Sequence, residues 1–356
     1  MLEIDGSYGE GGGQVLRTSI ALASLLNIPI RIYNIRANRP KPGLKTQHLI
    51  GIKAASKICN ANIEGAKLNS QEVIFRPNEI KGGNFKIEIS TAGSISLILQ
   101  VLMPIIAFAP RNVNLTITGG TDVNWSPPID YIINVIQPIM KLMGYNFQLK
   151  INKRGHYPKG GGMVSANFEP TQNLKSLNIK DYTEIKYIEG ISHCVRLPKH
   201  VAIRQMNAAN KVLRENGFQT AKIRIESYRP DRDPHLGPGS GIVLWAIPDN
   251  NIPLGSDSYG EKGKTAETVG QEAAKSLVEE LKSRANVDIH AADFLIPYIA
   301  LAKGESVIKT RTLTNHIKTN IDITSMILGI DFKIKKTKNG LYEISVNGIG
   351  LKNKYL

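Results

Sequence analysis

The segment Gly6–Gln14, GSYGEGGGQ, is the part of this sequence that best indicates the fold. It follows a short apolar start with Leu2 and Ile4, and it runs directly into Val15–Ala23, whose apolar residues have helical spacing. A glycine loop between a strand and a helix brings backbone N–H groups together at the helix N-terminus, where phosphate groups bind. The segment therefore predicts a strand, a phosphate-binding loop and a helix, in that order.

The same loop differs from the common nucleotide-binding motifs in two respects. It lacks the Gly-Lys-Ser/Thr ending of a Walker A loop, and it contains an acidic residue, Glu10. A carboxylate within a glycine loop indicates a divalent metal ion that bridges protein and phosphate. We therefore expect Glu10 to be a metal ligand.

The order of elements that starts at this loop recurs twice along the chain. The second copy begins at the alternating segment Phe85–Ile89, and the third begins at Val287–Ile289. Each copy has the order βαβαββ, which predicts an α/β (α+β) fold with a large domain of three repeated units. The loops before the first helices would then converge on one cleft; they are 9–13, 91–94 and 290–293.

Residues 181–280 separate the second copy from the third. They predict strands at 185–195, 221–227 and 241–247, and helices at 202–216 and 266–282. We therefore expect a small α/β domain, 181–280, inserted into a large domain formed by 1–180 and 281–356.

Composition limits the class of protein. Forty-two per cent hydrophobic and 21% charged residues indicate a globular chain, and the net charge of +15 favours an anionic partner, first of all nucleic acid. The alternative is a basic surface in contact with solvent.

The two cysteines argue against a disulfide framework. The absence of a signal peptide or transmembrane stretch predicts a cytoplasmic protein without a membrane partner.

Four further segments are candidates for binding. Arg36–Gly43 contains two prolines that stiffen it, so Arg36 and Arg39 can hold a phosphate in bidentate fashion; the alternative is an exposed basic turn. The other three have turns as their simplest explanation. Asp122–Pro128 would form an apolar wall for a base or ribose. Arg154–Gly162 is a glycine-rich basic hairpin. Ser256–Gly263 contains Tyr259 and Glu261, which would contact a nucleotide.

The seven histidines do not indicate a metal site, because no pair has helical metal-ligand spacing. His290 stands out among them because it occupies the loop position of the third copy. A Ser-His-Asp hydrolase is not supported, since the chain has no Gly-x-Ser-x-Gly motif.

Five segments in combination resemble the RNA 3′-terminal phosphate cyclase family, over nearly the whole chain. They are Gly9–Arg17, Arg36–His48, Gly119–Asp122 with Pro127-Pro128, Gly155–Gly162, and His290–Asp293. The resemblance implies three βαβαββ units with a small inserted domain. It also implies an ATP-dependent reaction in which a histidinyl-AMP forms, the adenylate passes to an RNA 3′-phosphate, and the 2′-hydroxyl closes a 2′,3′-cyclic phosphate with release of AMP.

The resemblance also implies roles for individual residues. His290 would be the nucleophile, and Glu10 would hold Mg²⁺ or Mn²⁺ near the triphosphate. The residues expected at phosphates or the RNA end are Gln14, Arg17, Arg36, Arg39, Gln47 and His48. Those expected at the nucleotide are Gln100, Pro128, Ser258, Tyr259, Gly260, Glu261 and Lys262.

Two other functions fit parts of the sequence. A cyclase-like protein without catalytic activity, acting in ribosome assembly, would share the fold, but His290 and Glu10 favour the enzyme. An enolpyruvyl-transfer enzyme is built from similar repeats, yet its small-molecule site gives no reason for so basic a chain. The oligomeric state is left open, with a homodimer as one alternative.

Overall fold

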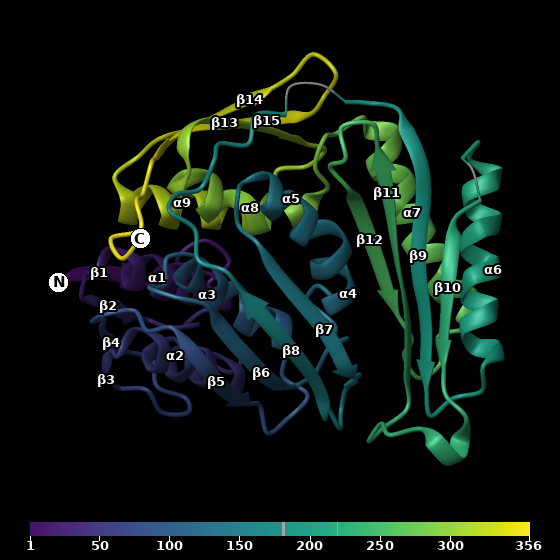
Figure 1. Cartoon of the computed structure of the whole chain (residues 1–356), viewed down its shortest axis with the longest axis horizontal. Helices are drawn as coiled ribbons and strands as arrows, with labels where there is room; N and C mark the ends of the chain where they lie inside the picture. The colour runs from purple at the N-terminus through teal and green to yellow at the C-terminus, as the bar shows by residue number, and fades with distance from the viewer. Residues whose placement is uncertain (180–181, 219) are drawn as a thin grey trace.

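The computed structural model describes residues 1–179, 182–218 and 220–356, and its first unit has the predicted order βαβαββ (Figure 1). Strand β1 pairs in parallel with β2, and β4 joins β2 to β3 in antiparallel fashion, which gives the sheet order β1-β2-β4-β3. The elements are β1 (Leu2–Asp5), α1 (Gly13–Leu26), β2 (Ile30–Tyr33), α2 (Thr46–Cys59), β3 (Asn62–Glu64) and β4 (Val73–Arg76).

The second unit has the same arrangement, with sheet order β5-β6-β8-β7. Its second helix consists of three consecutive parts, of which the middle one is π-helical. The elements are β5 (Gly83–Glu88), α3 (Ile95–Ala107), β6 (Val113–Gly119), α4 (Ile129–Tyr131), η1 (Ile132–Ile136), α5 (Gln137–Leu142), β7 (Phe147–Lys153) and β8 (Gly162–Phe168).

The third unit differs from its prediction at its first strand. The expected strand Val287–Ile289 is wrong: Asp288 is the N-cap of α8, and its carboxylate accepts hydrogen bonds from the His290 and Ala291 backbone amides. Asp favours this position because it satisfies amides that have no partner within the helix. His290–Asp293 is therefore not a loop but the first turn of α8. The elements are α8 (Ile289–Leu301), β13 (Lys303–Thr310), α9 (Asn315–Leu328), β14 (Phe332–Lys336) and β15 (Tyr342–Ile349), with order β13-β15-β14.

The missing first strand is supplied by residues that precede the inserted segment. Lys175 and Asn178 form parallel bridges with Lys303 and Val307 of β13, on the edge that β15 leaves free. The chain thus leaves the third unit after its first pairing segment, forms the inserted sheet, and returns at α8.

The inserted segment forms one sheet of order β10-β9-β11-β12, with a short 3-10 turn η2 (Pro230–Arg232). All five predicted elements are present, the first strand with the predicted bounds and the other four with shifted ends. Leu254–Tyr259 is an additional strand, although a turn was expected from 256. The predicted domain boundary at Lys180–Asp181 lies outside the described residues, so the division into two domains stays a prediction. The elements are β9 (Ile185–Val195), α6 (His200–Glu215), β10 (Lys222–Ser227), β11 (Gly239–Pro248), β12 (Leu254–Tyr259) and α7 (Ala266–Ser283).

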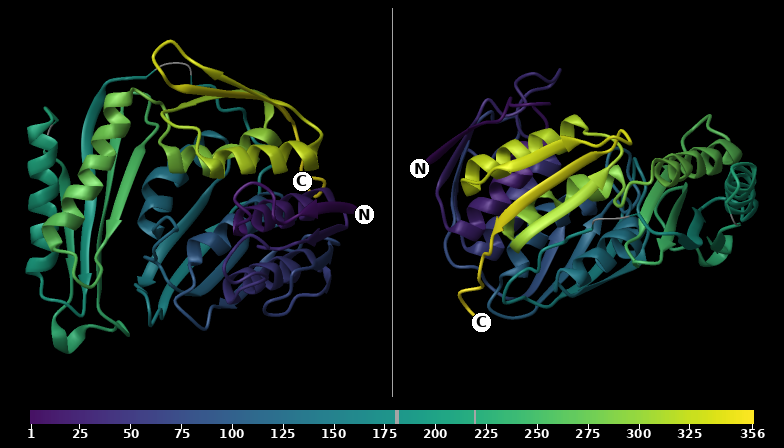
Figure 2. Two further views of the ribbon diagram at one scale, coloured as in Figure 1. Left: turned by 180° about the vertical axis from the view of Figure 1, so that it is seen from behind. Right: turned by 90° about the horizontal axis from the view of Figure 1, so that it is seen from above.

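Both faces of the inserted sheet are covered. On β11, Leu244 and Ala246 join a buried cluster with α6 and α7, whereas the alternating Val243 and Trp245 join the larger core of the rest of the chain. Helices α6 and α7 thus cover one face, and the other face turns towards the second unit (Figures 1 and 2). Within the described residues, no helix has both the length and the apolar character needed to cross a membrane.

Candidate active site

A cavity of about 570 Å³ lies where helices of all three units meet the inserted sheet. This volume is in the range of small-molecule sites. The lining includes helix residues from α1, α3, α8 and α9, which are Gln14, Arg17, Leu97, Gln100, His290, Asp293 and His316. It also includes residues of the loop after β6 and of the segment from β12 to α7, which are Asn124, Trp125, Ser126, Pro127, Asp257, Ser258, Tyr259, Glu261 and Lys264. All three units therefore contribute to the cavity, but only the third of the predicted segments, 290–293, lines it. No residue of 9–13 or 91–94 does; the first two units contribute residues of α1 and α3 and of the loop after β6 instead.

The position of His290 depends on Asp288, which is fully buried. Its Oδ1 accepts hydrogen bonds from Tyr131 Oη at 2.6 Å and from the His290 and Ala291 amides at 3.0 and 2.9 Å. Its Oδ2 accepts one from the Gly255 amide at 2.8 Å. One carboxylate thus joins the start of α8 to α4 and β12, while the His290 side chain stays exposed at the cavity.

Two carboxyl groups lie near His290. Burial raises the pKa of Asp257 to about 6, and the interaction with His290 only partly opposes this shift. Burial also raises the pKa of Asp293, opposed by His316 and Arg17. A carboxyl group with a pKa of about 6, that of Asp257, therefore lies near the predicted nucleophile.

A cluster of basic side chains lies at the start of α1. Burial lowers the pKa of Arg17 to about 10, and burial together with Arg39 lowers the pKa of Arg36. The pKa of His48 is lowered to about 3, mainly by burial and further by the positive charges of Arg17, Arg36 and Lys45. The Nε atoms of Arg17 and Arg36 are buried without hydrogen-bond partners. Crowded cations with unpaired donors are typical of an anion-binding site.

The glycine loop allows these side chains to approach. Helix α1 begins without a side-chain cap, and a Cβ at Gly13 would lie 2.5 Å from His48 Nε2. A Cβ at Gly12 would lie 3.3 Å from an Arg39 guanidinium nitrogen. Glycine at both positions therefore lets the free amides and the basic groups face the same space.

Glu10 lies beside a histidine that the sequence did not single out. Its Oε2 is 3.3 Å from His316 Nε2 and 3.7 Å from an Arg39 guanidinium nitrogen. A single carboxylate with an adjacent imidazole does not form a complete metal cage. It fits an ion such as Mg²⁺ or Mn²⁺ that takes most of its ligands from phosphates and water.

The remaining predicted phosphate ligand, Gln47, faces the second unit. Its Oε1 accepts a hydrogen bond from the Ser94 amide at 3.1 Å, and with His48 and Arg17 it lines a smaller neighbouring pocket. Gln47 therefore joins α2 to the start of α3.

The predicted nucleotide residues divide between two cavities. Asn124 donates to Glu261 at 3.0 Å and Tyr259 Oη donates to the Ser126 carbonyl at 3.1 Å, so the loop 122–128 and the end of β12 form one wall. Trp125 is 99% exposed at its rim. Gly260 and Lys262 line an adjoining cavity of about 900 Å³, which shares Tyr259 and Glu261 with the first.

One predicted contact is displaced. Pro128 is buried and is the N-cap of α4, so it does not line either cavity; its neighbour Pro127 lines the smaller one. Two adjacent prolines in a sequence do not reveal which of their two rings will face a cavity. Asp257 and His316 were not predicted, since isolated acidic and histidine residues carry no local signal of a shared site.

The fold and the site together define an α/β protein in which repeated units and an inserted sheet enclose a cavity whose lining includes Arg17 and Lys264. Residues 8–334 match the family model described as RNA 3′-terminal phosphate cyclase. The chain belongs to this family.

Curated relatives match along almost their whole length. A protein named RNA 3′-terminal phosphate cyclase from Methanopyrus kandleri is 48% identical over 94% of this chain and 95% of its own. Proteins of the same name from Hyperthermus butylicus and Pyrococcus furiosus are 48% and 47% identical, covering 98% and 94% of this chain and 98% and 95% of their own. A solved EPSP synthase from Acinetobacter baumannii covers 94% of this chain and 62% of its own at 13% identity and a TM-score of 0.28, which supports no argument.

Proposed function

We propose that this chain converts an RNA 3′-terminal phosphate into a 2′,3′-cyclic phosphate at the expense of ATP, with His290 as nucleophile. The observation that carries the proposal is the position of His290. Its exposed imidazole shares a cavity with Arg17, Asp257, Asp293 and Trp125. Family membership supports the same reaction.

In the first step an imidazole nitrogen of His290 attacks the α-phosphorus of ATP, the bond to the bridging oxygen breaks, and pyrophosphate leaves. An exposed imidazole is a competent phosphorus nucleophile when neutral. The positive charges of Arg17 and Arg39 and the free amides at the start of α1 oppose the charge that develops on the phosphates. A metal ion held by Glu10 would add to this neutralisation.

In the second step an oxygen of the RNA 3′-phosphate attacks the adenylate phosphorus, the nitrogen–phosphorus bond breaks, and His290 is released. In the third step the RNA 2′-oxygen attacks the activated terminal phosphorus and AMP leaves. The 2′-hydroxyl proton must be accepted by a base. Asp257 suits this task, because its pKa is raised to about 6 and it lies beside His290.

The test is covalent labelling. Full-length protein incubated with α-labelled ATP and Mg²⁺ or Mn²⁺ should acquire an acid-labile, base-stable label. His290→Ala should acquire none, whereas His316→Ala, which removes another histidine of the same cavity, should keep it. An unlabelled wild type, or equal labelling of His290→Ala, would overturn the mechanism.

The substrate is tested separately. An RNA with a 3′-phosphate should be cyclised, and the same RNA with a 2′-deoxy terminus should not, because the closing oxygen is absent. A cyclic product from the deoxy end would contradict the third step. A cytoplasmic location and the oligomeric state, including a homodimer, stay predictions.

A further inference from the structure

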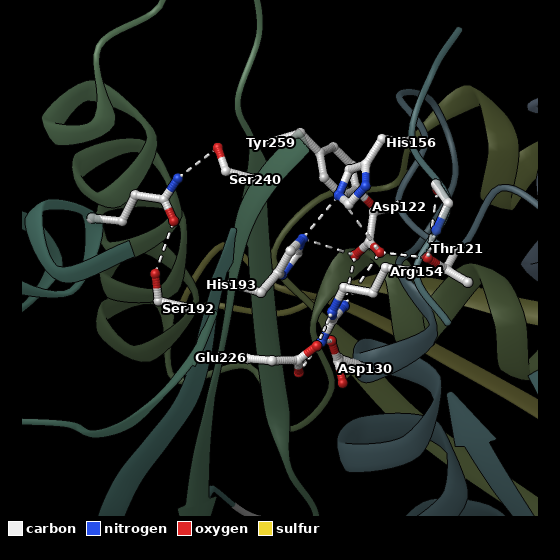
Figure 3. Close-up of polar contacts among 12 residues, drawn as sticks. Thr121, Asp122, Asp130, Arg154, His156, Ser192, His193, Glu226, Ser240 and Tyr259 are labelled. Atoms are coloured by element: carbon white, nitrogen blue, oxygen red, sulfur yellow. Dashed lines mark hydrogen bonds and ion pairs between the residues drawn. The ribbon is translucent and has the colours of Figure 1, made fainter. Parts of the chain in front are cut away.

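A second group of polar side chains lies outside the proposed active site, where the inserted sheet meets the second unit (Figure 3). It consists of Asp122 from the loop after β6, His156 from the connection between β7 and β8, and His193 from β9, all buried. His156 Nε2 lies 3.0 Å from His193 Nε2. These nitrogens lie 3.9 and 3.7 Å from Asp122 Oδ2 and Oδ1. One ligand atom from each residue therefore falls within 4.8 Å of the others.

The two rings are directed at each other only through Nε2. Their Nδ1 atoms are buried and have no hydrogen-bond partner. Polar contacts that orient both rings must therefore act at the two Nε2 atoms. A hydrogen bond there uses the lone pair of one ring only, whereas a metal ion would accept the lone pairs of both.

The surroundings leave space for the rings at two glycines of β11. A Cβ at Gly239 would lie 2.1 Å from His156 Cγ, and a Cβ at Gly241 would lie 3.0 Å from His193 Cε1. At Gly239 the imidazole of His156 occupies the position of a side chain, and at Gly241 the imidazole of His193 would be in tight contact with one. The site is thus built into the contact between the loop 155–162 and β11.

The carboxylate is also held in a fixed orientation. Thr121 Oγ1 donates to Asp122 Oδ2 at 2.6 Å, and Arg154 donates to both Asp122 oxygens at 3.3 and 3.2 Å. Hydrogen bonds of this kind orient the ligands of protein metal sites.

A buried guanidinium lies beside the cluster. Arg154 contacts Asp122, Asp130 at 2.7 Å and Glu226 at 2.8 Å, so three carboxyl groups share one guanidinium. Asp122 therefore has no cation of its own, and a divalent ion between Asp122 and the two histidines would supply one.

We propose that Asp122, His156 and His193 bind a first-row divalent metal ion, for which Zn²⁺ is the best-suited candidate. Two imidazoles and one carboxylate suit zinc better than the oxygen-binding Mg²⁺. Asp122 and His156 also line the cavity of about 900 Å³, so a further coordination position would face that cavity. Because two ligands come from the second unit and one from β9, the ion would tie the inserted sheet to the rest of the protein.

The site is separate from the metal expected at Glu10, and sequence spacing argued against it. Its three ligands come from segments that are distant in sequence, so no ligand motif forms. The proposal does not depend on the RNA chemistry assigned to His290.

The experiment is a metal titration of the full chain, purified without a histidine tag and freed of metal with a chelator. Zn²⁺ bound after gel filtration is measured by elemental analysis, and Co²⁺ is used as a spectroscopic probe of ligand geometry. Wild type should bind about one Zn²⁺ per chain, and Co²⁺ should give ligand-field absorption in the visible range. His156→Gln and His193→Gln should lose both signals.

Two matched controls locate the ion. Glu10→Gln and His316→Gln remove a carboxylate and a histidine at the other candidate site and should retain full zinc binding. Zn²⁺ should raise the unfolding temperature of wild type but not of His193→Gln, and the chelated forms of both should give the same circular dichroism spectrum.

Three results would overturn the proposal. The first is a wild type that binds no zinc, which would mean that the two histidines form a hydrogen-bonded pair and no metal site. The second is zinc binding by His193→Gln that equals that of wild type. The third is loss of zinc binding in Glu10→Gln but not in the His156 and His193 variants.

Discussion

His316 Nε2 lies 3.3 Å from Glu10 Oε2, so helix α9 of the third unit contacts the glycine loop of the first. The contact is reinforced by Tyr8, whose hydroxyl donates to Asp322 at 2.9 Å, and by Gly9, where a Cβ would overlap Thr319. The loop that begins the chain is therefore held by the far end of the chain. This arrangement places Glu10 beside the cavity that contains His290.

Replacement of Glu10 should change the metal dependence of the reaction. In Glu10→Gln we expect the Mg²⁺ or Mn²⁺ concentration for half-maximal adenylation to rise at least about ten-fold, which corresponds to ~1.4 kcal/mol of lost binding. His316→Gln, which leaves the carboxylate in place, should have the smaller effect. Initial rates of His290 labelling across a metal titration measure both. An unchanged titration curve for Glu10→Gln would exclude it as a ligand.

Gly13 should not tolerate a side chain. In Gly13→Ala the new Cβ would lie 2.5 Å from His48 Nε2, which must move away from the start of α1. We expect weaker binding of 3′-phosphorylated RNA, by about ten-fold or more. Gly51→Ala in α2 is the control, because its Cβ would meet neighbours only at 3.5 Å and helix propensity favours alanine. Equal RNA binding by the two variants would show that RNA binding does not require His48 to lie beside the start of α1.

Asp288 should contribute more to stability than an ordinary helix cap. Asp288→Ala removes a cap and leaves Tyr131 Oη and the Gly255 amide without their buried acceptor. We expect a loss of about 2–4 kcal/mol in the free energy of unfolding. Thr314→Ala, which removes the half-buried cap of α9, should cost only about 1 kcal/mol. Denaturant unfolding of both variants measures the difference, and similar losses would contradict the junction role of Asp288.

Asp257 should make stability depend on pH. Its pKa is raised in the folded state to about 6 from 3.8, so folding is penalised once the carboxyl must ionise. The penalty is absent below pH 4, develops as pH rises from about 4 to 6, and is complete above. Asp257→Asn should therefore be more stable than wild type at pH 8, by about 1–3 kcal/mol, and show little difference at pH 4.

The same substitution should slow cyclisation, because the proposed proton acceptor is lost. Unfolding curves at the two pH values and cyclisation rates at pH 8 test both effects. A variant that is neither stabilised at pH 8 nor slower would show that Asp257 is an ordinary exposed carboxylate.

Much of the architecture followed from local sequence. Glycines at Gly9 and Gly11 have φ of +59° and +55°, a conformation that glycine adopts at little cost, and the alternation in 85–89 predicted β5. The strand expected at Val287–Ile289 failed because the Asp288 carboxylate stabilises a helix start, which three residues of strand-like sequence do not reveal.

The sequence by itself determined most of the order of the elements and the glycine loop before the first helix, because backbone conformation and helix starts depend on neighbouring residues. Only the tertiary structure decided which side chains meet. It brought Asp257 and His316 to His290, left Pro128 buried, and placed His156 against His193. Such contacts depend on how the inserted sheet packs against the second unit and how α9 packs against the first loop, and distant residues that meet through packing leave no pattern in the sequence.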